Sequence, residues 1–180
     1  MAIETLMQEK ETASKYNPLG HLDGLNLTGK QKDLLYDLDN FEAPYLEERL
    51  LSDGKLKNSE EYREVFIEFK KYVALNKISG KKMMTMLSDQ VDEVWHQFIL
   101  FTPQYHEFCN ETLGEYFHHQ PWSKSVAESY REEGSKNLIE SYKEVFGEVP
   151  EIWERKSKSE NSDCARYCDN VPPPCCKVDA

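Results

Sequence analysis

Residues 58–74 carry the clearest structural pattern in the chain and read NSEEYREVFIEFKKYVA. Their apolar positions recur every three or four residues, which places them on one face of an α-helix. Asn58 is a residue type that caps helix N-termini, and Glu61 stands at the third helical position, where a carboxylate also favours a helix start. The segment therefore predicts a helix with one buried face, formed by Tyr62, Val65, Phe66, Phe69, Tyr72 and Val73.

The same period recurs on both sides of this segment, and no stretch alternates convincingly with the two-residue period of a strand. Start and stop signals divide the chain further, because Ser88 and Thr102-Pro103 favour helix starts while Gly114 and Gly147 favour helix ends. The sequence therefore predicts an all-α fold of five to seven helices. The further helices are expected from Thr28 to Phe41, from Ala43 to Leu51, from Ser88 to Phe101, from Thr102 to Gly114, and from Ser123 or Ser125 to Gly147.

The length of 180 residues suits one compact domain with a tail. We expect an N-terminal extension and a loop over residues 1–28, the helical domain over residues 29–155, and a flexible tail over residues 156–180. The tail holds three successive prolines and four of the five cysteines. These cysteines could bind a soft metal, form a redox pair, or be incidental thiols of a disordered segment. They are Cys164, Cys168, Cys175 and Cys176.

The charge balance excludes some classes of partner. The chain has 33 acidic and 22 basic residues and a net charge of −11, so its surface repels phosphate backbones and anionic lipid. We therefore expect no nucleic-acid partner, and we also expect no membrane span. Residues 1–15 lack the apolar core of a signal peptide, so we expect a cytoplasmic protein whose thiols stay reduced.

Residues 92–121 concentrate the chemically active side chains and read DEVWHQFILFTPQYHEFCNETLGEYFHHQP. Asp92 and His96 are four residues apart, so one helix face presents both of them. Tyr105 and Cys109 have the same spacing on the following helix, beyond a corner at Thr102-Pro103. We expect this corner to let the two helix faces converge. His118 and His119 follow Gly114 on a non-helical stretch, where either ring could turn toward the same site.

Two chemistries fit this set of residues. In the first, Asp92, His96, Cys109 and one of His118 or His119 hold a divalent transition metal, which would be zinc, or iron if the thiolate stays out. In the second, no metal is needed: Asp92 orients His96 as a base toward Cys109 or a substrate proton, with Tyr105 nearby. The substrate would be an unknown small molecule.

A third hypothesis gives the same residues structural roles in a protein-interaction module. An aspartate four residues before a histidine is a common helix ion pair, and Asp92 near a helix start also favours the helix dipole. Cys109 would then be a small buried side chain, and Trp95 would fill the core. An acidic, aromatic-rich helical body would suit a basic or disordered protein partner.

The segment also resembles a known family, the glycine-rich-domain-containing-protein-like family, and in particular its bacterial members. The similarity covers roughly residues 44–153, and it implies a helical domain without an agreed biochemical activity. Many relatives have a second histidine where this chain has Phe98, and the glycine richness of their tails is absent here. The residues that carry the resemblance are Val91 to His96, Thr102, Tyr105, Phe108, Cys109, Gly114, His118, His119 and Pro121, with the flanking segments Glu60 to Ala74 and Tyr142 to Trp153.

Overall fold

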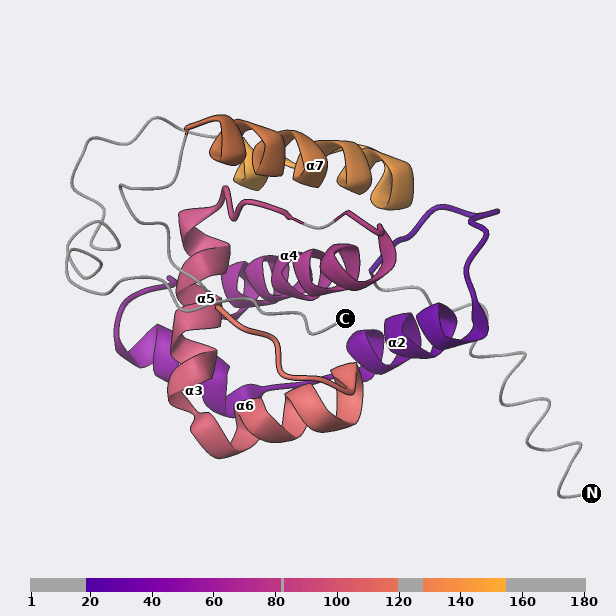
Figure 1. Cartoon of the computed structure of the whole chain (residues 1–180). Coiled ribbons are helices and arrows are strands. Elements are labelled where there is room, and N and C mark those ends of the chain that lie inside the picture. The colour runs from indigo at the N-terminus through magenta and orange to yellow at the C-terminus, as the bar shows by residue number, and fades with distance from the viewer. Residues whose placement is uncertain (1–18, 82, 120–127, 155–180) are drawn as a thin grey trace, which may run out of the picture.

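The computed structural model describes residues 19–81, 83–119 and 128–154 (Figure 1). The four tail cysteines lie outside these residues, as does most of the predicted N-terminal extension. Within the described residues the fold is all-α, as the sequence predicts. No helix in this part of the chain is both long enough and apolar enough to cross a membrane. The six α-helices of the described ranges are α2 (Gly29–Asn40), α3 (Pro44–Ser52), α4 (Ser59–Ile78), α5 (Asp89–Leu100), α6 (Thr102–Phe108) and α7 (Glu128–Phe146).

The predicted capping residues begin the helices where the sequence places them. The Asn58 side chain accepts a hydrogen bond from the backbone N–H of Glu61 at 2.9 Å and starts α4. The Ser88 hydroxyl accepts from the N–H of Val91 at 3.3 Å and starts α5. Each bond satisfies a backbone donor that has no partner within the helix, so these local sequence signals are sufficient to set the helix starts.

The segment after α6 differs from the prediction of one continuous helix up to Gly114. The α-helix ends at Phe108, and residues Cys109–Leu113 form a π-helical turn, η1. Gly114 then adopts a left-handed conformation with a φ of 72°, and the chain reverses. The extra residue in a π-helical turn changes where the following chain points, and such turns are common near functional sites.

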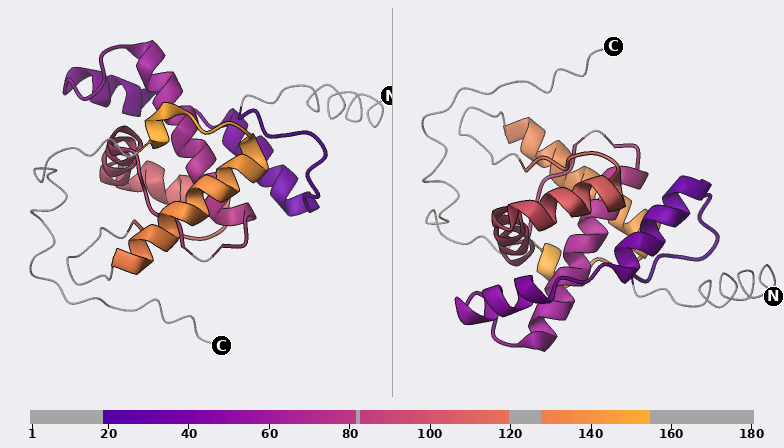
Figure 2. Two further views of the ribbon diagram at one scale, coloured as in Figure 1. Left: turned by 90° about the horizontal axis from the view of Figure 1, so that it is seen from above. Right: turned by 90° about the horizontal axis from the view of Figure 1, so that it is seen from below.

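Helix α4 forms the centre of the fold. It contacts α2, α3, α5 and α7, and α5 runs crosswise to it (Figures 1 and 2). All six apolar positions predicted for its inner face are buried. Because α5 packs on this central helix and continues through a sharp corner into α6, the core fixes the two helices that carry most of the predicted site.

One carboxylate is buried in this core and joins the C-terminal segment to α4. Glu68 is 7% exposed and accepts hydrogen bonds from the Tyr142 hydroxyl at 2.9 Å and from the Trp153 indole N–H at 2.6 Å. The Lys71 ammonium lies 2.8 Å from its other oxygen. Burial raises the pKa of Tyr142 far above its usual range, with the Glu68 charge adding to the effect, so this hydroxyl remains a donor. The 3-10 turn η2 (Glu151–Trp153) is held to the core in this way.

We expect Glu68→Ala to lower the free energy of unfolding by about 2–4 kcal/mol, because it leaves two buried donors and one largely buried ammonium without their shared acceptor. Urea unfolding followed by far-ultraviolet circular dichroism measures the change. Glu64→Ala, at an exposed position one turn earlier, should change stability by no more than about 0.5 kcal/mol. Equal small effects of both variants would show that the Glu68 network does not stabilise the fold.

Candidate metal centre

Helix α5 presents the first two residues of the site. Asp92 lies in its first turn, where a carboxylate interacts favourably with the helix dipole, and His96 lies one turn later. The His96 Nδ1 atom is 3.4 Å from Asp92 Oδ2. The predicted sharing of one face by these two side chains is therefore what the structure shows, and the helical period alone accounts for it.

The third residue comes from outside the helix. After Gly114 the chain returns from the end of α6 to α5, as Figure 1 shows, and carries His119 to the same carboxylate. The His119 Nε2 atom is 2.9 Å from Asp92 Oδ1, and the His119 ring centre is 4.4 Å from that of His96. The Asp92 carboxylate thus meets one imidazole at each oxygen.

These three side chains could hold a metal ion. Each offers one ligand atom, and the three atoms lie within 4.8 Å of one another. Donor atoms in a tetrahedral zinc site are about 3.4 Å apart, given metal–ligand bonds of about 2.0–2.2 Å. His96 Nδ1 and His119 Nε2 lie 3.4 and 2.9 Å from different oxygens of Asp92, and the three donor atoms lie within 4.8 Å of one another, so the side chains must adjust around one carboxylate oxygen to reach this spacing. The site is also open to solvent on one side, because the His96 side chain is 36% exposed while that of His119 is 11% exposed.

Aromatic residues behind the site fix the His119 ring and the backbone before it. The Trp95 indole stacks on Phe117 with ring centres 4.7 Å apart and meets the His119 ring edge-on at 4.3 Å. The Trp95 N–H donates to the Tyr105 hydroxyl at 3.0 Å, and that hydroxyl donates in turn to the Phe117 carbonyl oxygen. Burial raises the pKa of Tyr105 well above its usual range, so the hydroxyl keeps the proton that it donates.

The structure does not bring Cys109 into the three-residue group. Cys109 is fully buried, and its sulfur accepts a hydrogen bond from the Phe117 backbone N–H at 3.5 Å. Tyr105 is 1% exposed and likewise faces this backbone. The corner after Phe101 does bring α6 against α5, but the thiol points at the backbone that precedes His119 and not at the carboxylate.

Of the two neighbouring histidines, His119 faces the site and His118 does not. His118 is exposed, and its ring lies beside Tyr116 with centres 4.7 Å apart. Sequence reasoning could not choose between them, because adjacent residues of an extended segment point in different directions. The contacts of the Phe117 backbone are a further part of the site that was not predicted, because no sequence signal marks them.

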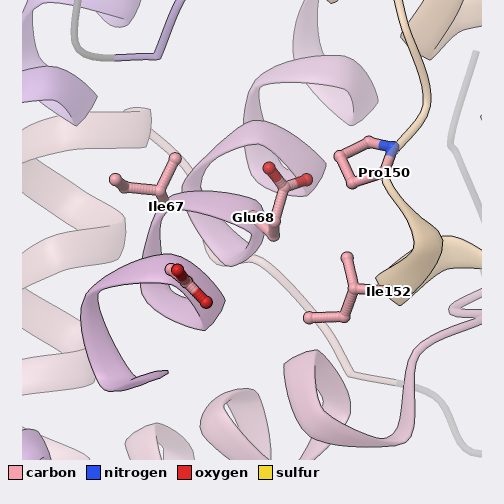
Figure 3. Close-up of a pocket in the computed structure, with 5 residues that line it drawn as sticks. Ile67, Glu68, Pro150 and Ile152 are labelled. Atoms are coloured by element: carbon pink, nitrogen blue, oxygen red, sulfur yellow. The ribbon is translucent and has the colours of Figure 1, made fainter. Parts of the chain in front are cut away.

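A separate hollow of about 400 Å³ lies between α4 and the segment formed by Pro150 and η2 (Figure 3). Its lining comes from Glu64, Ile67 and Glu68 of α4 and from Pro150 and Ile152. None of the three clustered residues lines it. The Glu68 oxygens already accept three kinds of donor, so this hollow offers a ligand little beyond apolar contact.

Comparison with known proteins identifies a family whose model matches this chain. The UCP032817-like family matches residues 36–143, which include Asp92, His96 and His119. The match supports a family relationship but not the glycine-rich naming that the sequence resemblance carries. No curated protein and no solved structure matches the chain. Since the matched residues are more than half of the chain, the protein belongs to the UCP032817-like family.

Proposed function

We propose that this protein binds a divalent transition metal through Asp92, His96 and His119. The observation that carries the proposal is the meeting of a carboxylate and two imidazoles from two separate segments within 4.8 Å. The helical spacing explains Asp92 and His96, but it does not explain why the chain returns after Gly114 to add a second imidazole to the same carboxylate.

The donor set favours particular metals. With the Cys109 thiol directed elsewhere, the ligands are two nitrogens and one carboxylate oxygen. Zinc enzymes use this combination with an open fourth position, and non-haem iron(II) enzymes use it as three ligands on one side of the metal. We therefore propose zinc or iron(II). The exposed side of His96 leaves room for water or a small-molecule substrate to complete the coordination.

Metal binding in this site competes with protons. The 2.9 Å contact between His119 Nε2 and Asp92 Oδ1 is a hydrogen-bond distance, so a proton joins these two groups in the metal-free protein, whereas the 3.4 Å between His96 Nδ1 and Asp92 Oδ2 is longer than a usual N–H···O bond. A bound ion takes the place of the shared proton and accepts the same lone pairs. In the competing hypothesis, the three residues form only an ion-pair network in a protein-interaction module. That hypothesis predicts that no metal ion binds to them.

We expect the full-length, tag-free chain to bind one zinc or cobalt(II) ion per molecule in a background where the four tail cysteines are serine. His119→Ala and His96→Ala should each weaken binding by roughly 100-fold or more, since each removes one of three ligands. His118→Ala is the matched control, because it removes an adjacent exposed imidazole and should leave the affinity unchanged. Isothermal titration calorimetry measures both, and wild-type binding that persists in His119→Ala would contradict the proposal.

We expect the Cys109 thiol to be inert in the folded protein, which opposes the alternative of a thiol enzyme. Cys109 is fully buried and its sulfur accepts a hydrogen bond from the Phe117 N–H, so iodoacetamide should modify it far more slowly in the native protein than in urea. Peptide mass spectrometry measures the two rates. Rapid labelling of Cys109 in the native state at neutral pH would instead favour nucleophilic chemistry.

A further inference from the structure

We propose that Tyr105 and Cys109 are positioning residues that hold the Phe117 backbone and thereby set His119 for metal binding. The inference rests on the proposed metal site and adds the means by which the protein keeps its one non-helical ligand in place. It gives a joint role to the pair that the sequence singles out by its four-residue spacing.

The two side chains form hydrogen bonds with both polar groups of the Phe117 backbone. The Cys109 sulfur accepts from its N–H at 3.5 Å, and the Tyr105 hydroxyl donates to its carbonyl oxygen. Tyr105 belongs to α6, and Cys109 begins η1 one turn later. One helical face therefore holds the extended segment two residues before His119.

Tyr105 is itself held by contacts with α5, the helix that carries the other two ligands. Tyr105 packs edge-on against Phe98 with ring centres 5.0 Å apart, and its hydroxyl accepts the Trp95 N–H at 3.0 Å. Trp95 lies on α5 between Asp92 and His96, and its ring contacts both Phe117 and His119. The distance from His119 to the helical ligands is thus determined by protein contacts before any metal arrives.

Such preorganisation affects affinity through conformational entropy. A ligand on a loose segment must be immobilised when the metal binds, and the lost freedom opposes binding. Groups that orient metal ligands from outside the coordination sphere typically change metal affinity by roughly 10–100-fold when they are removed. Tyr105 and Cys109 would likewise act from outside the coordination sphere, through the Phe117 backbone.

The test uses Tyr105→Phe, which keeps the ring packing and removes both hydrogen bonds of the hydroxyl. We expect its zinc affinity to fall roughly 10–100-fold in the full chain with serine at the tail cysteines. Tyr62→Phe is the control, because it removes another buried hydroxyl, which donates to the Ala43 carbonyl at 2.9 Å and not to the Phe117 backbone. It should lose a similar amount of stability toward urea and keep the zinc affinity of the wild type.

Cysteine variants supply a second comparison. Cys109→Ala removes the acceptor for the Phe117 N–H and should weaken zinc binding, whereas Cys109→Ser keeps an acceptor of similar size and should restore most of the affinity. Equal affinity in Tyr105→Phe, Cys109→Ala and wild type would overturn the proposal.

A measurement without metal separates this proposal from the metal proposal. The ring current of Trp95 should shift the His119 ring protons in the NMR spectrum of the metal-free wild type, because the two rings lie 4.3 Å apart. We expect Tyr105→Phe to move these signals toward the positions of an unstructured histidine, and Tyr62→Phe to leave them in place. If the wild type binds no zinc, the metal proposal fails and the positioning role is decided by these shifts alone; unchanged shifts in Tyr105→Phe would overturn it.

Discussion

The indole N–H of Trp95 lies in the core, where an unsatisfied donor would cost free energy, and the Tyr105 hydroxyl accepts it at 3.0 Å. That hydroxyl donates its own hydrogen bond to the Phe117 carbonyl oxygen, so two linked hydrogen bonds connect α5, α6 and the segment that returns after Gly114. The stacking of Trp95 on Phe117 reinforces the connection. We infer that the placement of His119 beside Asp92 and His96 depends on these contacts, because the helical spacing accounts only for the two residues on α5.

The fold and the site differ in how far the sequence predicts them. Helix periods and caps such as Asn58 and Ser88 are local properties, so the helices could be placed, and the spacing of Asp92 and His96 follows from one helical turn. The π-helical turn at Cys109–Leu113 depends on tertiary packing and was not predictable. The direction of the Cys109 thiol and the choice of His119 over His118 depend on that turn and on Gly114, and so they lay beyond sequence reasoning as well.

The carboxylates of Glu68 and Asp92 differ in the chemistry of the side chains that surround them. Glu68 is 7% exposed, and its partners are an ammonium, a phenol and an indole, all of which serve it as donors. Such partners hold the carboxylate in place and do not supply the imidazole ligands that a metal site would use. Asp92 is more exposed, and the partners described here are two imidazoles, each of which can release a proton and present a nitrogen lone pair. Glu68 therefore joins the C-terminal segment to α4, whereas Asp92 lies in a three-residue group that could hold a metal ion.

The most direct test of the metal site is an anomalous diffraction map of crystals grown with zinc, recorded at the zinc absorption edge. We predict one strong peak about 2.0–2.2 Å from a ring nitrogen of His96, a ring nitrogen of His119 and an oxygen of Asp92. A map with no peak among these three side chains in crystals that hold zinc elsewhere, such as at the tail cysteines, would contradict it.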